Sequence, residues 1–522
     1  MAETKREIER KYESDESGLP DLTGVAGIET VVDKGVAELD ATYYDTRDER
    51  LAAASITLRR RTGGSDAGWH LKLPVGPGVR DEVRAPLSPS LPRSLAGLVR
   101  ARVRGAELVP VVRLRSARDV RELVDGEGRL LAEVSVDAVR AERLSGGDGA
   151  VQWSEIEVEL ADGGDPALLD QIEKRLRKAG VRPSASASKL ARALAETVSK
   201  KGRPKEGKGK RAGSKKPAAE TPATPATAVP SPGTAAHHVL AYLRAQRDAI
   251  LALDPAVRQD EFDSVHRMRV ATRRTRSAFK SFGKVLDRTV TDPIGEELKW
   301  LAGELGVDRD REVLTERITA ALDKLPRQLV VGPVRTRVRT WSHARRGGSR
   351  RRLIAVLDGK RYLALLDALD AVIAEPPLLE AAAGKPEKVL AKAVRKDFAK
   401  VAALVEEALA QPSPGPGRDL ALHEARKKAK RTRYSAEAAE PALGDPATAL
   451  VKAAKSLQNL LGDHQDSVMA RESLRDIAGQ AHAAGENGFT YGLLYGREEQ
   501  RAAADEARLP ELWAELKGGT GL

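Results

Sequence analysis

The chain has 522 residues, of which 31% are charged and 41% hydrophobic, and it contains no cysteine. These figures are typical of a soluble globular protein of two or three domains, and they exclude disulfide bonds and thiolate metal sites. The formal net charge of +12 predicts attraction to polyanions such as nucleic acid, polyphosphate or small phosphorylated compounds. The sequence lacks both a run of about 18 apolar residues and the apolar core of a signal peptide, so we expect a cytoplasmic protein with no membrane partner.

The first part of the chain, up to residue 198, has the pattern of short β-strands separated by turns. Two helices are expected after the strands, at roughly 166–179 and 187–197, the first beginning at Asp165-Pro166. A series of short strands of this kind predicts a closed antiparallel barrel over residues 1–198. The expected strands are 5–12, 39–46, 55–62, 68–74, 79–84, 109–116, 118–124, 129–139 and 151–160.

Charged residues alternate along these strands, so each strand has one charged face. In the first strand Glu7, Glu9 and Lys11 share a face. The same alternation groups Arg59 with Arg61, His70 with Lys72, Arg80 with Glu82, Arg113 with Arg115, Glu133 with Asp137, and Glu155 with Glu157 and Glu159. The opposite faces carry Ile8, Leu58, Leu71, Leu114, Ile156 and Val158, which we expect to pack against the flanking helices.

A barrel with a charged interior is stable only if the interior stays wet or holds ions. Glutamates supply the oxygen ligands that Mg²⁺ or Mn²⁺ prefers, and Arg and Lys supply donors for phosphate oxygens. Their combination is the chemistry of metal-dependent phosphoryl transfer.

These residues carry a family resemblance over about residues 3–200. Glu7-Ile8-Glu9-Arg10-Lys11 resembles the ExExK signature of the CYTH family, the triphosphate tunnel metalloenzymes. The later family motifs follow in the expected order: Thr42-Tyr43-Tyr44-Asp45-Thr46, Leu58-Arg59-Arg60-Arg61, the strand of Lys72, Arg80-Asp81-Glu82, Glu155-Ile156-Glu157-Val158-Glu159-Leu160 and Ser188-Lys189-Leu190.

The resemblance implies catalytic roles for Glu7, Glu9 and Lys11, with Mg²⁺ or Mn²⁺ as the cofactor. It implies that Glu7, Glu9, Glu155 and Glu157 hold the metal. Alternation leaves open which of Glu155, Glu157 and Glu159 binds it, because all three share a face. The implied substrate-binding residues are Lys11, Arg59, Arg61, Lys72, Glu82, Arg113, Arg115, Glu133 and Lys189.

Residues 199–235 have the composition of a flexible linker. Lys200 to Lys216 is rich in Lys, Arg and Gly, and Pro217 to Pro232 is rich in Ala, Pro and Thr. Neither stretch offers enough apolar surface to form a core, so it separates two domains.

Residues 236–522 are predicted to form an all-α domain. Segments rich in Ala, Leu, Arg and Glu have helical periodicity, and we expect breaks at Asp254-Pro255, Asp292-Pro293, 410–418 and Glu440-Pro441. The domain contains an internal repeat with an offset of about 156 residues, in which 265–276 parallels 422–433. Leu305-Gly306 with Asp310 likewise parallels Leu461-Gly462 with Asp466. The repeat predicts two related helical bundles.

Each repeat carries a basic stripe headed by a histidine. His266, Arg269, Arg273 and Arg276 share one helix face, and His423, Arg426, Lys430 and Arg433 share another. Like charges on one stripe repel each other, which favours an anionic partner. The segment 236–515 resembles the CHAD family, a conserved-histidine α-helical domain with two repeats. That resemblance implies binding of inorganic polyphosphate by His266, Arg269, Arg273, Arg274, Arg276, His423, Arg426, Lys430, Arg431 and Arg433.

Together the two resemblances imply a cytoplasmic inorganic triphosphatase joined to a polyphosphate-binding domain, with polyphosphate granules as a further expected location. Three alternatives remain open at this point. The barrel could act on another triphosphate such as ATP (as an adenylate cyclase) or thiamine triphosphate. The protein could be a non-enzymatic polyphosphate-granule protein. It could also bind nucleic acid, which the aromatic content of 3% disfavours because few rings are available to stack on bases.

Overall fold

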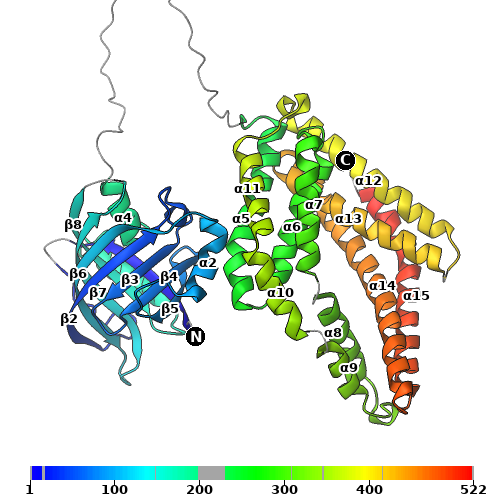
Figure 1. Cartoon of the computed structure of the whole chain (residues 1–522), viewed down its shortest axis with the longest axis horizontal. Helices are drawn as coiled ribbons and strands as arrows, with labels where there is room; N and C mark the ends of the chain where they lie inside the picture. The colour runs from blue at the N-terminus through cyan, green and yellow to red at the C-terminus, as the bar shows by residue number, and fades with distance from the viewer. Residues whose placement is uncertain are drawn as a thin grey trace, which may run out of the picture. The chain divides into compact units, whose positions relative to one another are not determined.

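The computed structural model describes residues 3–14, 18–146, 149–197, 230–306, 309–343, 346–413 and 415–519, with the side chains of 309–312, 343–348 and 519 left out. The chain divides into two compact units, Met1–Ala219 and Glu220–Leu522 (Figure 1). Most of the expected linker, 199–229, lies outside the described residues. Within the described ranges, every helix is too short or too polar to cross a membrane.

The first unit is a closed antiparallel barrel, as the alternating pattern predicted. The eight strands among the described residues run in the order β1-β5-β4-β3-β2-β6-β7-β8, and β1 pairs with β8 to close the ring. Their bounds are β1 Glu3–Glu13, β2 Thr30–Asp45, β3 Thr57–Thr62, β4 Gly68–Gly76, β5 Val79–Pro86, β6 Val109–Val124, β7 Leu130–Arg143 and β8 Ala150–Leu160.

Two strand predictions were wrong in their extent. The expected strands 109–116 and 118–124 form the single strand β6, because Ser116 and Ala117 pair with both neighbouring strands and make no turn. The expected strand 39–46 is the end of the much longer β2. The first half of β2 was missed because it contains Gly35 and a bulge between Asp33 and Val36, which disrupt the alternation.

Helices cover the outer face of the barrel. Leu58 and Leu71 pack with the helices α1 (Arg50–Ala53) and α2 (Arg93–Val103), which the sequence did not reveal. Ile156 and Val158 pack against α3 (Ala167–Lys178). These contacts confirm the expected direction of four of the apolar strand residues.

Leu114 was assigned to the wrong face. It lies in an apolar cluster with Tyr43, Val139 and Trp153. The register of the sheet places all four of these side chains on the inner face of the barrel. Apolar residues of α4 (Lys189–Glu196) complete this cluster, and Figure 1 shows α4 across one end of the barrel. One end of the barrel interior is therefore an apolar plug, and the remainder is charged.

The second unit is helical among its described residues, apart from its loops and an isolated β-bridge between Leu286 and Leu378. Its longer helices are α5 Ala235–Gln259, α6 Ser264–Ser281, α7 Arg288–Glu304, α8 Arg309–Asp323, α9 Val334–His343, α10 Arg346–Asp358, α11 Lys360–Ala374, α12 Pro386–Ala410, α13 Pro416–Leu443, α14 Asp445–Ala483 and α15 Phe489–Gly519.

The break predicted at 410–418 is confirmed, since α12 ends at Ala410 and α13 begins at Pro416. The other three breaks were wrong, because Pro255, Pro293 and Pro441 lie inside α5, α7 and α13. Each of these prolines is within six residues of a helix end. A proline there removes few hydrogen bonds, so packing of the helix can compensate for it.

The repeat seen in the sequence is present in the packing. Helix α6 contacts α5 and α7, and α13 contacts α12 and α14 in the same manner. The two repeats meet where α6 lies against α13. The helices that carry the basic stripes are thus neighbours.

Candidate functional sites

The charged faces of the barrel strands enclose a cavity of about 300 Å³. This volume is at the small end for ligand cavities and suits a small polar molecule. Its charged lining consists of Lys5, Glu7, Glu9, Lys11, Arg59, Arg61, Asp66, Lys72, Arg80, Glu82, Arg84, Arg118, Glu133, Glu157, Glu159 and Lys189.

One wall of the cavity gathers carboxylates on neighbouring strands. In the register of the sheet Glu9 on β1 lies directly opposite Glu159 on β8, and Glu159 lies directly opposite Glu133 on β7. Like charges in directly opposed positions destabilise a sheet. Burial and the neighbouring Glu159 raise the pKa of Glu133. A divalent cation would relieve this crowding, and glutamate oxygens are ligands that Mg²⁺ or Mn²⁺ accepts, so the residues fit the metal.

Glu7 extends the same acidic wall. Its carboxylate is 2% exposed and lies 2.5 Å from the ammonium of Lys72. Burial, together with Glu82 and Glu159, outweighs Lys72 and raises the pKa of Glu7 to about 7. Glu9 behaves differently. Burial alone would raise its pKa, but Lys11, Lys72 and Arg80 lower it to about 2.

The facing wall gathers cations. In the closed order of strands β3 stands four places from β8, and β4 stands four places from β7, so these strands face each other across the barrel. Arg59 and Arg61 on β3 and Lys72 on β4 line the cavity there. Burial and the positive charges of Arg59 and Arg118 lower the pKa of Arg61 to about 9. An anion at this wall would relieve that repulsion.

The inner end of the cavity is organised by Lys189 from the first turn of α4. Its ammonium lies 2.9 Å from Asp137, 2.7 Å from Glu155 and 2.7 Å from Glu157. The three carboxylates lie close enough together to hold a metal ion, but the Lys189 ammonium already stands among them. Burial opposes its charge, yet these carboxylates raise the pKa of Lys189 above its usual value.

The structure separates the three glutamates of β8. Glu157 and Glu159 line the cavity, whereas Glu155 lies behind it and accepts a hydrogen bond of 2.5 Å from the indole of Trp153. The Lys189 ammonium holds the other oxygen of Glu155. Metal ligation by Glu155 therefore remains a prediction, and the cavity wall favours Glu159 in its place.

Arg113 and Arg115 do not line the cavity. Both lie on the outer face of β6, where Arg113 donates hydrogen bonds of 2.9 and 2.5 Å to Asp40 and Arg115 lies 3.5 Å from the same carboxylate. The expectation that they face the tunnel was wrong because the interior at their level is the apolar plug that contains Leu114.

The arginine that β6 contributes to the cavity is Arg118. Its guanidinium lies 2.7 Å from Asp137 and 2.6 Å from Glu157. The sequence reading missed it because Arg118 is out of phase with Arg113 and Arg115. Lys5, Arg84 and Arg80 also line the cavity, although the sequence did not single them out as binding residues; Lys5 continues the alternation of Glu7 and Glu9.

Most of the site residues predicted from the sequence do line the cavity. They are Glu7, Glu9, Lys11, Arg59, Arg61, Lys72, Glu82, Glu133, Glu157 and Lys189.

A second charged site lies where α6 meets α13. We define the basic cluster as Arg269 and Arg273 of α6 with Arg426 and Lys430 of α13. Burial and repulsion from Arg273, Arg426 and Arg269 lower the pKa of Lys430 to about 7. Burial and the neighbouring cations, against the effect of Tyr434, likewise lower the pKa of Arg273. Lys430 and Arg273 are thus buried beside further cations.

The glycines of the repeated Leu-Gly motif lie against this cluster. A β-carbon on Gly306 would come within 2.9 Å of the Arg269 guanidinium, and one on Gly462 within 3.2 Å of the Arg426 guanidinium. Glycine therefore leaves the space in which each stripe arginine lies. Asp466, which follows Gly462 in the motif, stands 3.8 Å from Arg426. The side chain of Asp310, its counterpart, is outside the described part of the chain.

The other stripe residues are arranged differently. Arg274 and Arg433 each lie 3.0 Å from Glu437, and Arg276 lies 3.4 Å from Glu296. Arg431 turns toward Asp397 at 3.2 Å. His266 is exposed at the start of α6, whereas His423 is half-buried. Burial and then Lys427 lower the pKa of His423.

Comparison with known proteins agrees with this division. Residues 5–194 match the family model of the CYTH domain, and residues 241–475 match that of the CHAD domain. The chain belongs to the family that joins a CYTH domain to a CHAD domain. The CYTH family binds triphosphate substrates and includes triphosphatases. Its tunnel enzymes depend on a metal ion.

The chain is 39% identical over 516 residues to the uncharacterized protein Rv2226 of Mycobacterium tuberculosis H37Rv, and the match covers 95% of this chain and 93% of that protein. The CHAD domain from the plant Ricinus communis is similar at 24% identity and a TM-score of 0.41, over 55% of this chain and 92% of that chain. PptA from Streptomyces chartreusis is similar at 20% identity and a TM-score of 0.46, over 54% of this chain and 99% of that chain.

Proposed function

We propose that the CYTH domain hydrolyses inorganic triphosphate to diphosphate and phosphate with Mg²⁺ or Mn²⁺, and that the CHAD domain binds inorganic polyphosphate. One observation carries the first part: the carboxylates of the acidic wall and the cations of β3 and β4 line one small cavity together. The acidic wall alone would suit a metal, and the cations alone would suit an anion. Both together suit a metal-bound phosphate chain.

In this proposal Glu7, Glu9 and Glu159 hold the cation, with Glu133 beside them. When bound, the cation neutralises negative charge on the phosphate oxygens. Arg59, Arg61 and Lys72 hold the chain from the facing wall by charge-assisted hydrogen bonds. Arg118 and Lys11 fix Glu157, and Lys189 fixes it from the closed end, so the polar wall keeps its shape without rearrangement during the reaction.

The reaction itself needs one water molecule. Its oxygen forms a bond to the terminal phosphorus, the bond from that phosphorus to the bridging oxygen breaks, and diphosphate leaves with its charge matched by Arg and Lys side chains. A carboxylate of the acidic wall orients the water, and its proton passes to that carboxylate or to solvent. The plug closes one end of the cavity to a substituent beyond the phosphates. The small cavity volume of about 300 Å³ favours inorganic triphosphate over the larger ATP or thiamine triphosphate.

The second part rests on the basic cluster. A flexible chain of phosphates has no bases or other groups to be recognised, so closely spaced cations from two neighbouring helices are a sufficient binding surface. Burial and the three neighbouring arginines lower the pKa of Lys430, and a bound polyanion would offset the repulsion from those arginines.

The deciding experiment is phosphate release by the full chain from tripolyphosphate, ATP, thiamine triphosphate and long polyphosphate, each with and without Mg²⁺ or Mn²⁺. We expect metal-dependent release that is fastest from tripolyphosphate. No release from any of the four across a wide pH range would overturn the enzymatic proposal, and faster release from ATP or thiamine triphosphate would overturn the choice of substrate. Polyphosphate binding that survives high salt unchanged would contradict the second part, because neutralising a polyanion releases its counterions.

A further inference from the structure

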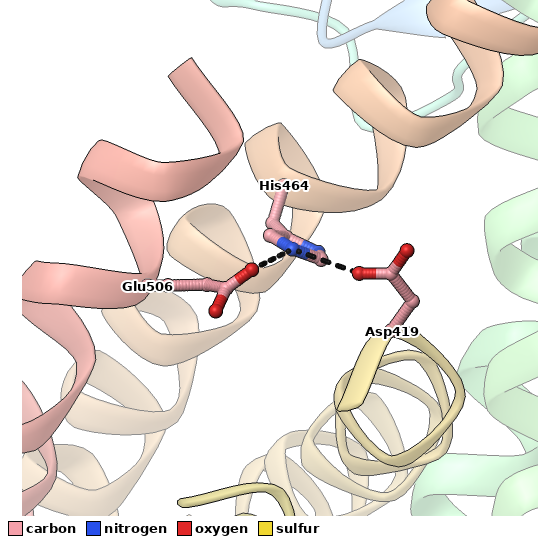
Figure 2. Close-up of side chains that lie close together, drawn as sticks. All are labelled: Asp419, His464 and Glu506. Atoms are coloured by element: carbon pink, nitrogen blue, oxygen red, sulfur yellow. Dashed lines mark hydrogen bonds and ion pairs between the residues drawn. The ribbon is translucent and has the colours of Figure 1, made fainter. Parts of the chain in front are cut away.

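A buried cluster in the helical unit combines one histidine with two carboxylates, away from both sites described above. Asp419 comes from the first turn of α13, His464 from the middle of α14 and Glu506 from α15. His464 is 2% exposed and Glu506 is 7% exposed. Figure 2 shows the three side chains pointing toward one another from the three helices.

The distances within the cluster match the spacing of ligands around one metal ion. His464 Nε2 lies 3.1 Å from Glu506 Oε1 and 3.4 Å from Asp419 Oδ1. All three atoms lie within 4.8 Å of one another. Two ligands at about 2.1 Å from one ion, separated by an octahedral or tetrahedral angle, stand roughly 3.0–3.4 Å apart.

A hydrogen bond at His464 Nε2 serves only one of the two carboxylate oxygens near it, the Glu506 Oε1 atom at 3.1 Å. The Nε2 atom of an imidazole carries at most one hydrogen, yet two carboxylate oxygens are directed at it. A metal ion would satisfy Nε2 and both oxygens at once.

The outer carboxylate oxygens have partners of their own, as is usual around a metal site. Glu506 Oε2 accepts a hydrogen bond of 2.5 Å from Ser413 and lies 2.6 Å from Arg418. Asp419 Oδ2 lies 3.8 Å from Arg471. Such outer contacts orient metal ligands and leave the inner oxygens for the ion.

The two arginines would oppose a cation if they were the only charges nearby. Asp463 is adjacent to His464, and Asp505 is adjacent to Glu506. Asp505 interacts electrostatically with Asp463 and His464, and also with Arg508 and Arg317. These carboxylates add negative charge around the cluster, and the Asp419 side chain, at 30% exposure, gives an ion access from solvent.

We propose that Asp419, His464 and Glu506 bind one divalent transition-metal ion that fastens α13, α14 and α15 to one another. A nitrogen ligand with two carboxylates suits Mn²⁺, Co²⁺ or Zn²⁺ better than Mg²⁺, which prefers oxygen ligands alone. Asp419 lies one helical turn before His423, and His464 lies two residues before Asp466, which faces Arg426. The ion would therefore fix the positions of the helices that carry half of the basic cluster.

The test uses the full chain freed of metal and dialysed against Co²⁺ in an excess of Mg²⁺, which keeps the all-oxygen tunnel occupied. Bound cobalt is measured by elemental analysis and by its visible absorption. We compare wild type with His464→Gln, and with His482→Gln as a matched control, because His482 is an exposed histidine on the same helix. Wild type and His482→Gln should bind one equivalent more than His464→Gln.

A second variant guards against misfolding of His464→Gln. Asp419→Asn alters a partly exposed ligand and should weaken cobalt binding by at least about tenfold while the far-UV circular dichroism stays unchanged. Equal cobalt content in wild type and both ligand variants would overturn the proposal and leave the cluster as a buried ion pair. Glu7→Gln should retain the extra equivalent, so failure of the tunnel proposal would be seen separately.

Discussion

The tunnel and the basic cluster are both rich in Arg and Lys, but they differ in how that charge is compensated. In the tunnel, carboxylates and cations line the same cavity. Burial and neighbouring carboxylates raise the pKa of Glu7 and Glu133, and burial and neighbouring cations lower that of Arg61. In the basic cluster, burial and then repulsion between cations lower the pKa of Lys430 and Arg273. The charges of the tunnel therefore suit the binding of a cation together with an anion, whereas those of the basic cluster suit an anion alone.

The tunnel and the basic cluster also differ in how far the protein encloses them. The tunnel is a closed ring of strands with an apolar plug at one end, so a ligand can extend past the cavity only through the other end. The basic cluster lies on two neighbouring helices and includes side chains that are only partly buried. A site of the first kind suits a short substrate that is converted, and a site of the second kind suits a chain of indefinite length that is held.

The largest effect expected is loss of activity in Glu9→Ala with polyphosphate binding intact. Removing this carboxylate takes a hard-cation ligand from the acidic wall, and kcat for tripolyphosphate should fall by about a hundredfold or more. The matched control is Glu3→Ala, which changes an exposed glutamate of the same strand. An active Glu9→Ala enzyme would show that the acidic wall does not hold the metal.

The reciprocal change is Arg269→Ala combined with Arg426→Ala. Each arginine supplies charge-assisted contacts worth about 1.5–3 kcal/mol, so polyphosphate affinity should fall by at least about a hundredfold while tripolyphosphate hydrolysis continues. Lys427→Ala, at an exposed lysine of α13, serves as the control. Loss of hydrolysis in the double variant would show that the two sites are coupled.

Arg118→Lys tests the arginine that the structure adds to the tunnel. Lysine keeps the charge but cannot make the two-pronged contact that Arg118 makes with Asp137 and Glu157, so kcat/KM should fall by roughly tenfold. Arg115→Lys, on the outer face, should leave steady-state kinetics within about twofold. Equal effects of the two substitutions would contradict the assignment of Arg118 to the inner face of β6 and Arg115 to the outer face.

The affinity of the basic cluster should depend on pH through Lys430. Its pKa is lowered to about 7 in the free protein, and a bound phosphate favours the charged form, so the pKa rises on binding. Affinity is therefore fully present below pH 7 and declines above it, by up to about tenfold per pH unit. Lys430→Arg should remove this dependence in binding isotherms measured from pH 6 to 9. A profile that is unchanged in Lys430→Arg would assign the dependence to another group.

The smallest effect expected is that of Gly462→Ala. Alanine in the middle of α14 should raise helix stability by about 1 kcal/mol, but its β-carbon meets the Arg426 guanidinium. We expect a higher Tm together with polyphosphate affinity weakened a few-fold. Gly479→Ala on the same helix has open space around the new carbon and should raise Tm alone. Unchanged polyphosphate affinity in Gly462→Ala would show that binding does not depend on the position of the Arg426 guanidinium.

The sequence by itself was sufficient for the division into a barrel and a helical unit. Side chains alternate along a strand, so Glu7 and Glu9 had to share a face, and this local rule needs no knowledge of the neighbours. The helical repeat was equally visible, because residues three or four apart share a helix face wherever the helix lies. Most of the charged residues that line the cavity lie on strand faces identified in this way.

Only the tertiary structure decided which face of β6 is inside. Along most of the barrel the charged face of a strand is the inner face. Near the plug this is reversed, because the interior is apolar and the exterior charged, so Leu114 points in and Arg113 points out. The register of separate strands set Glu9, Glu159 and Glu133 side by side. The packing of three helices likewise brought Asp419, His464 and Glu506 together. Contacts between residues far apart in the chain depend on how the elements pack, and periodicity within one element does not record that packing.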